Sequence, residues 1–322
     1  MERLRNASEP SPKRWEFRSP AARGKAAVRG RPPRMTRDLS HDHSLLSLNT
    51  ATLRKQGDFL AIVEACVRHG IRAVSPWRDQ VGVVGLDQAV RAVKDAGLAL
   101  SGYCRGGMFP ADAAHAQEAR DDNRRAVDEA AALGSPCLVL VVGGLPQFSR
   151  PGSAPSKDLG GAHAMVEDGI AALLDHARAV GMPLAIEPLH PMYAADRACV
   201  NTLAHALDLC DKLDPDRTGA LGIALDVYHV WWDPALSAEI ARCGVERMLA
   251  YHVCDWLVPT RDLLLDRGMM GDGVIELSRI RAEVEAIGFD GFVEIEIFSE
   301  DWWAKPIDEV LRTCIERHRS VV

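Results

Sequence analysis

Apolar positions along the chain from residue 45 onward form two alternating patterns: short uninterrupted runs and longer segments with helical spacing. The short runs have the length of buried strands and cover residues 45–50, 71–77, 98–104, 137–143, 183–189, 221–229, 248–256 and 292–298. The amphipathic segments lie near residues 58–69, 87–96, 115–133, 163–180, 201–213, 235–243, 276–287 and 306–319. Because a helix-like segment follows each strand-like run, the pattern predicts parallel strands joined by helical crossovers.

Several of the predicted helices end at a glycine immediately before the next strand, as at Gly97 and Gly181. A glycine in this position closes a helix and turns the chain back. Eight strand–helix units favour a closed (β/α)8 barrel over an open doubly wound sheet. No Gly-x-Gly-x-x-Gly motif follows the first strand, so a dinucleotide-binding domain lacks its phosphate loop. We therefore expect an α/β protein with a single TIM barrel over residues 41–322.

The first 37 residues differ from the rest in charge and composition. They carry a net charge of +8, which leaves −15 for the remainder because the whole chain carries −7. This segment is rich in Pro, Ser, Gly and Ala without apolar periodicity, which is typical of a disordered tail. It also has the Arg-rich composition of an organellar transit peptide, and a basic tail can tether nucleic acid. We favour a third alternative, in which translation naturally begins at Met35, so residues 1–40 are expected to be a disordered or non-native extension.

The composition of the remaining chain excludes two classes of partner. An acidic surface argues against binding of nucleic acid, because contact with phosphates needs a basic footprint. No apolar run approaches the roughly 20 residues of a membrane span. The eight cysteines form no C-x-x-C pair and no dense cluster. Such spacing is typical of reduced thiols, and we therefore expect a cytoplasmic protein.

Four late strand-like runs each carry an acid or a histidine near their carboxyl end: Glu187, Asp226, His252 and Glu296. A barrel gathers these ends at one mouth. Singly, each residue has an ordinary explanation, such as a helix cap or a buried core histidine. Together, the carboxylates would repel one another unless a divalent cation compensated them. The oxygen-rich set suits Mn²⁺ best, with Mg²⁺, Co²⁺ or Zn²⁺ as alternatives.

Glu294 lies two positions before Glu296 and should project to the same face of its strand. It is one layer deeper in the barrel, where an unpaired carboxylate is unfavourable. We expect Glu294 to be a core residue that is hydrogen-bonded to its neighbours, and we do not assign it to the metal.

The segments "IEP", "LDVYH", "YHVCD", "RGMMGDGVIEL" and "GFDGFVEIEIF" together resemble the sugar phosphate isomerase/epimerase family, which consists of xylose isomerase-like TIM barrels. The resemblance covers about residues 40–320. It implies that the four strand-end residues bind one divalent metal ion. It further implies that Glu187 and Glu296 exchange the substrate proton, and that His229 contacts the substrate, as in the epimerase branch.

One position departs from the epimerase pattern. In place of the arginine that epimerases carry six residues after the metal histidine, this chain has Val258, with Arg261 and Arg267 further on. The nuclease branch of the family needs more histidines to hold three zinc ions than this chain has near the relevant strand ends. DNA repair is therefore disfavoured.

The predicted site indicates an isomerase or epimerase that acts on a sugar or cyclitol carbonyl. A metal ion that chelates a carbonyl and an adjacent hydroxyl acidifies the C–H between them and stabilises the enediolate, while Glu187 and Glu296 transfer the proton. A good leaving group next to this carbanion would instead give a lyase or dehydratase acting on a keto-sugar or inosose. A sugar-binding barrel without turnover is a third alternative.

Other side chains near the strand ends are candidates for contact with a hydroxylated substrate. The first candidates are His190, His229, Asp255 and Arg267. The second group consists of Trp77, Arg78, Trp231, Trp232, Trp302 and Trp303. Aromatic rings can stack on a sugar face, but the paired tryptophans could equally pack a loop or a subunit contact. A homo-oligomer therefore stays open.

Overall fold

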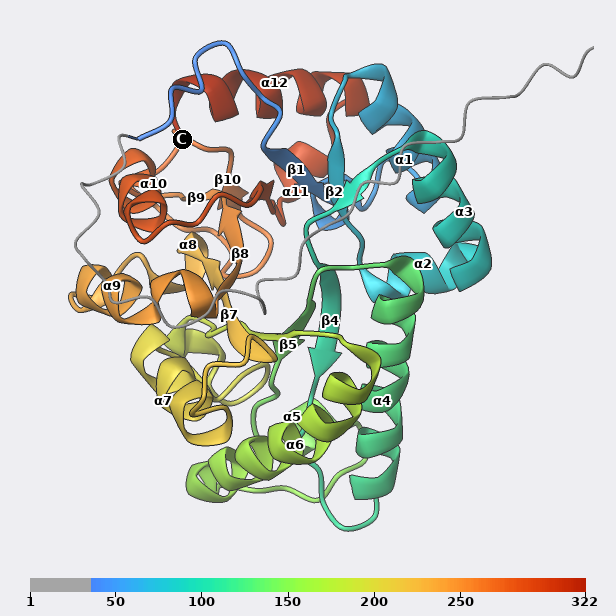
Figure 1. Cartoon of the computed structure of the whole chain (residues 1–322), viewed down its shortest axis with the longest axis vertical. Coiled ribbons are helices and arrows are strands. Elements are labelled where there is room, and N and C mark those ends of the chain that lie inside the picture. Colours follow the sequence, from blue (N-terminus) through green and yellow to red (C-terminus); the bar gives the residue numbers. More distant parts are fainter. Residues whose placement is uncertain (1–35) are drawn as a thin grey trace, which may run out of the picture. The chain divides into compact units, whose positions relative to one another are not determined.

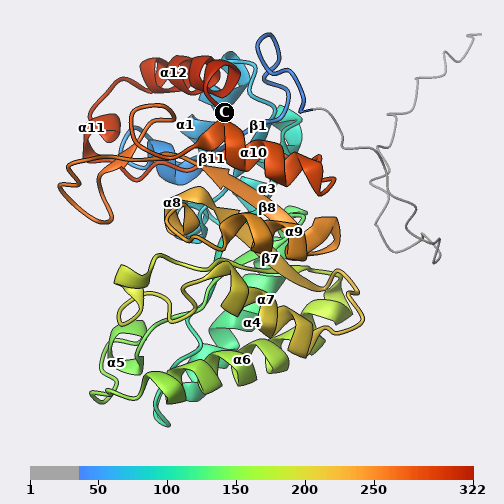
Figure 2. The ribbon, with the colours of Figure 1, turned by 90° about the vertical axis from the view of Figure 1, so that its left-hand side faces the viewer.

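The structure, a computed structural model, describes residues 36–322. Within these residues nine parallel strands form one sheet in the order β3-β2-β1-β11-β8-β7-β6-β5-β4. The strands are β1 (Leu46–Asn49), β2 (Ala73–Ser75), β3 (Ala99–Leu100), β4 (Tyr103–Gly107), β5 (Leu138–Val141), β6 (Leu184–Ile186), β7 (Leu221–Asp226), β8 (Met248–Val253) and β11 (Val293–Ile295). Figure 2 shows β11, β8 and β7 side by side, in agreement with this order.

The first and last strands of this order, β3 and β4, are two halves of one stretch of chain. The backbone N–H of Ser101 donates to the carbonyl of Val74 at 3.2 Å, and that of Tyr103 donates to the carbonyl of Cys137 at 3.1 Å. One edge of the stretch therefore pairs with β2 and the other with β5, which curls the sheet into a barrel. The predicted TIM barrel is confirmed, and the predicted run 98–104 is the place where it closes.

Long helices surround the strands in chain order from α1 to α12 (Figure 1). The helices are α1 (Phe59–Arg68), α2 (Arg78–Val84), α3 (Leu86–Ala96), α4 (Ala116–Leu133), α5 (Pro146–Ser149), α6 (Leu159–Val180), α7 (Leu203–Leu213), α8 (Val227–Val230), α9 (Leu236–Arg247), α10 (Leu277–Ala286), α11 (Glu300–Trp303) and α12 (Ile307–Ser320). Gly97 and Gly181 end α3 and α6 with φ values of 65° and 73°, which confirms the predicted C-caps. The helices α2, α5, α8 and α11 were not predicted because they are too short to show a hydrophobic periodicity in the sequence.

The barrel has two apolar layers. Small side chains fill its interior: Cys104, Cys137, Val139, Ala185, Ala224 and Ala250. Larger side chains, such as Leu138 and Leu140 on β5, face the surrounding helices. All eight cysteines lie within the described residues, where they are free and buried. Small interior residues leave room at the carboxyl ends of the strands for the polar side chains of the site.

A short antiparallel hairpin interrupts the regular barrel after β8. It pairs β9 (Asp255–Trp256) with β10 (Arg267–Gly268), so residues 257–266 leave the barrel and return to it. The predicted run 248–256 joined β8 and β9 into one strand, and the hairpin itself was not predicted.

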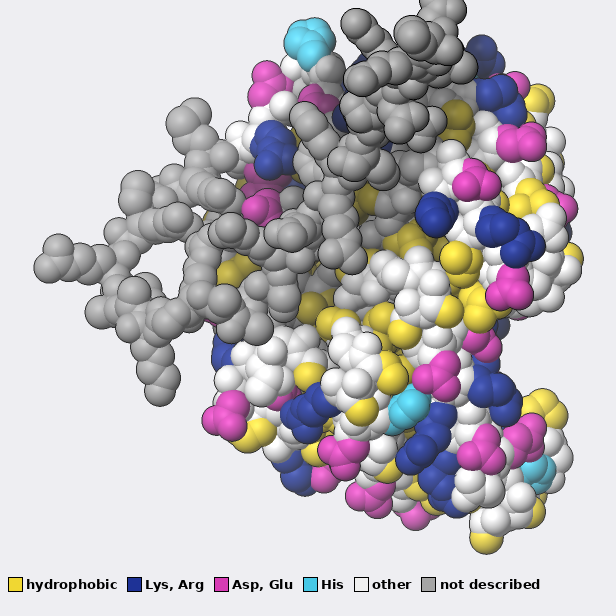
Figure 3. Space-filling view, turned by 45° about the vertical axis from the view of Figure 1, so that its right-hand side comes forward, with side chains coloured by type: hydrophobic (Ala, Val, Ile, Leu, Met, Phe, Trp, Pro, Cys, Tyr) yellow, Lys and Arg dark blue, Asp and Glu magenta, His cyan; other side chains and the backbone are white. Residues whose placement is uncertain are grey.

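The chain already packs against the barrel before residue 41. Leu39 is buried, and the backbone of Arg37 is held by α10: its N–H donates to Glu285 at 2.7 Å and its carbonyl accepts from Arg281 at 3.0 Å. The predictions for residues 1–35, including a start at Met35, lie outside the described residues. No helix within residues 36–322 is long and apolar enough to cross a membrane. Figure 3 shows lysine and arginine side chains interspersed with acidic ones on the part of the face that is coloured by type.

Candidate metal centre

The four predicted ligands converge at the carboxyl ends of four neighbouring strands. Glu187 follows β6, Asp226 ends β7, His252 lies in β8 and Glu296 follows β11. Each offers one ligand atom, and these atoms all lie within 4.8 Å of one another. The side chains are buried, with Glu187 the most exposed at 4%. The structure thus brings together all four residues in the geometry that a single ion needs.

The imidazole of His252 turns its Nδ1 atom toward this cluster. Nδ1 lies 3.1 Å from Oε1 of Glu187 and 3.9 Å from Oε2 of Glu296. The other nitrogen, Nε2, lies 3.5 Å from Oε1 of Glu294. Nδ1 is therefore the nitrogen through which His252 would bind a metal ion held by the four side chains.

Glu294 is buried beneath the cluster and bonded to its neighbours, as predicted. Its Oε1 accepts a hydrogen bond from Nδ2 of Asn49 at 2.7 Å, and its Oε2 accepts one from Oγ of Ser101 at 2.7 Å. The same Asn49 amide donates to Oε1 of Glu296 at 2.9 Å. Asn49 was missed by the sequence analysis, although a polar residue at the end of the first predicted strand was a usable signal.

Arg267 lies directly against the predicted ligands. Its Nη1 donates to Oδ2 of Asp226 at 2.8 Å and to Oε2 of Glu296 at 3.1 Å, and its Nη2 donates to Nε2 of His229 at 3.1 Å. The guanidinium carbon lies 4.4 Å from the ring centroid of Tyr228. The β9–β10 hairpin returns the chain to this point, so Arg267 reaches the cluster although the position six residues after His252 holds Val258.

The electrostatics of the cluster favour a further cation. Burial raises the pKa of Glu187, and it raises that of Glu296 to about 8 although Arg267 opposes it. Burial also acts to raise the pKa of Asp226, but Arg267, followed by the two nearby histidines, outweighs it and lowers that pKa to about 2. For His252, burial is outweighed by the surrounding carboxylates, and the pKa rises. Glu187 and Glu296, unlike Asp226, are thus under-compensated by the protein's own charges.

The donor set itself fits a divalent ion. Three carboxylates and one imidazole are ligands of Mn²⁺, Mg²⁺ or Zn²⁺, and the cluster contains no thiolate of the kind found in structural zinc sites. A dication would satisfy the carboxylates whose pKa values burial raises, and it would take the place of the proton on His252.

A wall of aromatic rings stands beside the cluster. His190 stacks on Trp256 with centroids 5.0 Å apart, and it meets Trp232 edge-on at 5.6 Å. Trp256 also contacts Tyr228 at 4.7 Å. Such a surface suits the apolar face of a sugar ring.

His229 presents a polar group next to this wall. Burial lowers its pKa to about 3, so the ring is neutral, and the hydrogen bond from Arg267 to Nε2 leaves the proton on Nδ1. Within residues 36–322 this Nδ1 has no hydrogen-bond partner, and neither does Nε1 of Trp231. Buried donors without partners are groups that a hydroxylated ligand could satisfy.

Two other residues that were predicted to contact the substrate, Asp255 and Arg78, bind other parts of the protein instead. Asp255 accepts hydrogen bonds from the backbone N–H groups of Trp256, Gly271 and Ile275 at 2.8, 2.9 and 3.0 Å, so it braces the turn after β10. Arg78 pairs with Glu129 at 2.7 Å on α4.

The remaining tryptophans mainly serve packing. Trp77 packs edge-on against Phe298 at 5.2 Å, and Trp303 donates its Nε1–H to the carbonyl of Ala51 at 2.8 Å. Lys305 lies over Trp302 at 5.0 Å.

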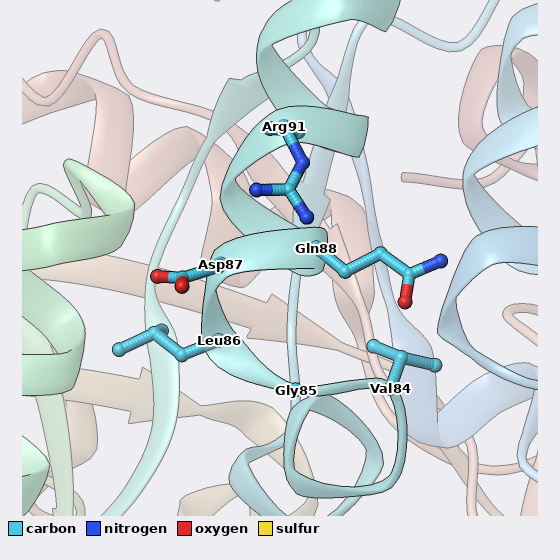
Figure 4. A pocket seen from close by; sticks show the side chains of 6 residues that line it. All are labelled: Val84, Gly85, Leu86, Asp87, Gln88 and Arg91. Atoms are coloured by element: carbon cyan, nitrogen blue, oxygen red, sulfur yellow. The ribbon is translucent and has the colours of Figure 1, made fainter.

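A surface pocket of about 350 Å³ lies at the junction of α2 and α3 (Figure 4). It is lined by Val84, Gly85, Leu86, Asp87, Gln88 and Arg91. None of these residues belongs to the metal cluster, and the pocket offers a single carboxylate and a single guanidinium. We do not consider it a candidate for the main site.

Comparisons with known proteins agree with the fold. Inosose isomerase from Bacillus licheniformis is 26% identical over 157 residues, which are 47% of this chain and 52% of that protein. The chain thus spans about half the length of the curated relatives it matches. A protein from Sinorhizobium meliloti 1021 with a known crystal structure is 60% identical with a TM-score of 0.81, over 85% of this chain and 97% of that one. The IOLI protein, solved with a bound zinc atom, is 18% identical with a TM-score of 0.70, over 84% and 94% of the two chains, and shows the same fold.

The model of one protein family matches residues 63–317, which is most of the chain and includes all four strands that carry the cluster. The chain belongs to the family of xylose isomerase-like TIM barrels.

Proposed function

We propose that this protein is a divalent-metal-dependent isomerase or epimerase that acts at the carbonyl of a sugar or cyclitol. The observation that carries the proposal is the convergence of four donor atoms within 4.8 Å at the mouth of the barrel. The similarity to inosose isomerase supports a small cyclitol or sugar as the substrate. The zinc in the IOLI structure, which has the same fold, supports a divalent ion.

Glu187, Asp226, His252 and Glu296 would hold the ion, and Mn²⁺ is our first choice because the set is rich in carboxylate oxygen. When bound, a divalent ion polarises a carbonyl and acidifies the neighbouring C–H. The protein's own residues then have to move the proton and position the substrate.

We propose that Glu187 and Glu296 move the proton from two sides of the substrate. In the sheet order β11-β8-β7-β6, Glu296 and Glu187 belong to the outer two strands, so a substrate over the cluster lies between them. Asn49 and Arg267 hold the two oxygens of Glu296, and His252 holds one oxygen of Glu187. Removal by one carboxylate and return to the opposite face by the other gives epimerisation. Return to the adjacent carbon, with the hydroxyl proton passing to the former carbonyl oxygen, gives isomerisation.

His190, His229 and Arg267 are our candidates for contact with the substrate hydroxyls. His229 offers an unpartnered Nδ1–H, and His190 belongs to the aromatic wall. Asp255 was predicted for this role, but backbone amides already occupy its carboxylate, and we now propose that it is structural.

The test is exchange of solvent deuterium into candidate substrates. Ketoses, inososes and 3-keto-glycosides are incubated in D₂O with Mn²⁺ and followed by NMR. Deuterium in the carbon-bound position together with a new epimer or isomer supports the proposal. Loss of a leaving group would instead identify a lyase using the same site. Absence of exchange with all three substrate classes and with their carboxylated or phosphorylated derivatives, despite bound metal, would indicate a sugar-binding barrel without turnover.

A further inference from the structure

Three arginines near the barrel mouth have no close acidic partner among residues 36–322. Arg105, Arg150 and Arg197 are half-buried. Within residues 36–322, Arg105 has no ion pair or hydrogen bond, Arg150 donates only to the carbonyl of Met108 at 3.1 Å, and the acid nearest to Arg197 is Asp196 at 3.9 Å. Partly buried cations without carboxylates are unfavourable unless something else compensates them.

Most other half-buried arginines are paired with an acid, and Arg319, which donates to His43 at 2.7 Å, is an exception. Arg78 lies 2.7 Å from Glu129, and Arg242 lies 2.6 Å from Asp208. The chain beyond residue 37 has fifteen more acidic than basic residues, given a whole-chain charge of −7, so carboxylates are not scarce. The absence of an acid beside Arg105, Arg150 and Arg197 therefore does not follow from a general shortage of carboxylates.

These arginines follow three consecutive strands of the barrel. Arg105 lies in β4, Arg150 lies beyond β5 and Arg197 lies beyond β6. The loops that carry them interlock. The hydrogen bond of Arg150 to Met108 ties the second loop to the first, and Gly143 forms a parallel bridge with Ala198 in the third.

The backbone of β4 turns Arg105 out of the regular strand pattern. The register with β5 shifts between Cys104 and Gly106, so Arg105 is the extra residue of a β-bulge. Cys104 packs in the barrel interior, whereas a Cβ on Gly106 would meet Leu138 at 2.8 Å on the outer side of β5. Bulges next to active sites commonly re-aim a side chain.

A chain of contacts leads from Arg197 toward the metal cluster. The guanidinium carbon of Arg197 lies 5.5 Å from the ring centroid of Tyr193, whose ring lies 5.9 Å from that of His229. His229 in turn approaches Asp226 at 3.6 Å. Arg105 and Arg197 are near enough that Arg197 helps burial to lower the pKa of Arg105.

We propose that Arg105, Arg150 and Arg197 form a subsite for an anionic group of the substrate, a carboxylate or a phosphate. This inference rests on the proposed function, because the carbonyl end would lie over the metal cluster on β6, β7, β8 and β11 while the anionic end lies over the loops that carry the three arginines, at and after β4, β5 and β6. Guanidinium groups bind both anions through paired, charge-assisted hydrogen bonds. The substrate is thus an acidic sugar derivative or a sugar phosphate rather than a neutral polyol.

The test uses three matched ligands that cannot turn over: glucitol, gluconate and glucitol 6-phosphate. Their binding to the full chain with Mn²⁺ is measured by calorimetry, for the unchanged protein and for Arg105→Gln, Arg197→Gln and Arg91→Gln. Arg91 is an exposed arginine on α3, remote from the cluster, and serves as the matched control. We expect one or both anions to bind at least about tenfold more tightly than glucitol, and Arg105→Gln and Arg197→Gln to abolish this preference.

The proposal is overturned if neither anion binds more tightly than glucitol, or if Arg91→Gln weakens anion binding as much as the other two changes. The stronger of the two anions identifies the group. If Arg105→Gln does not fold, Arg197→Gln decides, because its side chain is more exposed to solvent, at 38%. Binding does not require turnover, so a failure of the isomerase proposal would appear in the deuterium assay and leave this result readable.

Discussion

Nε2 of His252 lies 3.5 Å from Oε1 of Glu294, and no other acid faces this nitrogen within residues 36–322. The two residues are directly paired across β8 and β11. At 3.5 Å the contact is longer than a good hydrogen bond. Within residues 36–322, Glu294 is nevertheless the only acidic residue that faces this side of the imidazole ring. A carboxylate behind a histidine ligand fixes the tautomer that leaves the other nitrogen free for a metal.

Glu294→Gln should therefore weaken metal binding without removing a ligand. The amide keeps an oxygen that can accept from Asn49, but it no longer attracts the proton on Nε2 of His252. We expect the affinity for Mn²⁺ to fall by about 10- to 100-fold, measured by calorimetry. Glu64→Gln, an exposed change on α1, is the control. An affinity equal to that of the control would show that Glu294 does not orient the histidine.

Replacement of either proton-transfer glutamate should separate catalysis from metal binding. Glu187→Gln and Glu296→Gln each keep one oxygen ligand but remove the base, so turnover should fall by roughly 10² to 10⁴. In an epimerase, each variant should still exchange deuterium into one epimer without completing the inversion. In a lyase, only one variant should lose exchange. Full activity of both variants on an identified substrate would exclude the proposed proton transfer.

Removal of the metal should lower thermal stability. An ion that binds only the folded state stabilises it by roughly 3 kcal/mol at about 100 times its Kd, so a chelator should lower the melting temperature by several degrees. Glu296→Gln should respond less to Mn²⁺ because one ligand is weakened. Equal melting temperatures with Mn²⁺ and with chelator, together with no bound ion in elemental analysis, would contradict a metal centre at this cluster.

The polar residues at the strand ends could be predicted from the sequence because they interrupt runs that are otherwise apolar and therefore expected to be buried. Glu187, Asp226, His252 and Glu296 interrupt apolar runs, and the barrel rule places such interruptions at a common mouth. Glu294 was identified in the same way, since period-two alternation puts it on the face of Glu296. These features depend on local patterns, and the structure agrees with them.

The side chains that contact these residues, or that lie near them, could not be predicted from local sequence patterns. Arg267 reaches the cluster through a hairpin that adds residues 257–266, and no periodicity marks such an excursion. Arg105 is aimed by a bulge, which depends on pairing with β5 rather than on the sequence of β4. Asp255 sits at a strand end like the ligands, yet the turn that follows it uses its carboxylate.

Asp255→Ala should destabilise the protein rather than act on substrate binding alone. The change would leave the backbone N–H of Ile275 buried without an acceptor and remove the acceptor of the partly buried N–H of Gly271, at a cost of about 1 to 3 kcal/mol for the buried group. Asp255→Asn keeps one acceptor oxygen and should be milder. Urea denaturation measures both variants, with Asp87→Ala at the surface of α3 as the control. If Asp255→Ala is as stable as the control and only raises KM, the residue contacts substrate as the sequence suggested.

Stability in acid should depend on His318, which is fully buried on α12. Within residues 36–322 neither ring nitrogen has a hydrogen-bond partner. Burial, followed by His43, Arg281 and Arg319, lowers its pKa from 6.5 to about 4, with Asp42 weakly opposing. The unfolded chain therefore binds more protons than the folded one between these two values, so stability is fully present above pH 6.5 and is lost as the pH falls toward 4.

The loss attributable to His318 is about 3 kcal/mol over that window. His318→Leu removes the titrating group, so the difference in unfolding free energy between about pH 7 and about pH 4.5 should shrink by most of this amount. His41→Gln, an exposed change, should leave the difference as it is. Other groups also titrate in this range, but they act equally in the three proteins and cancel in the comparison. If His318→Leu and the unchanged protein lose stability in parallel, buried His318 is not the source of the acid sensitivity.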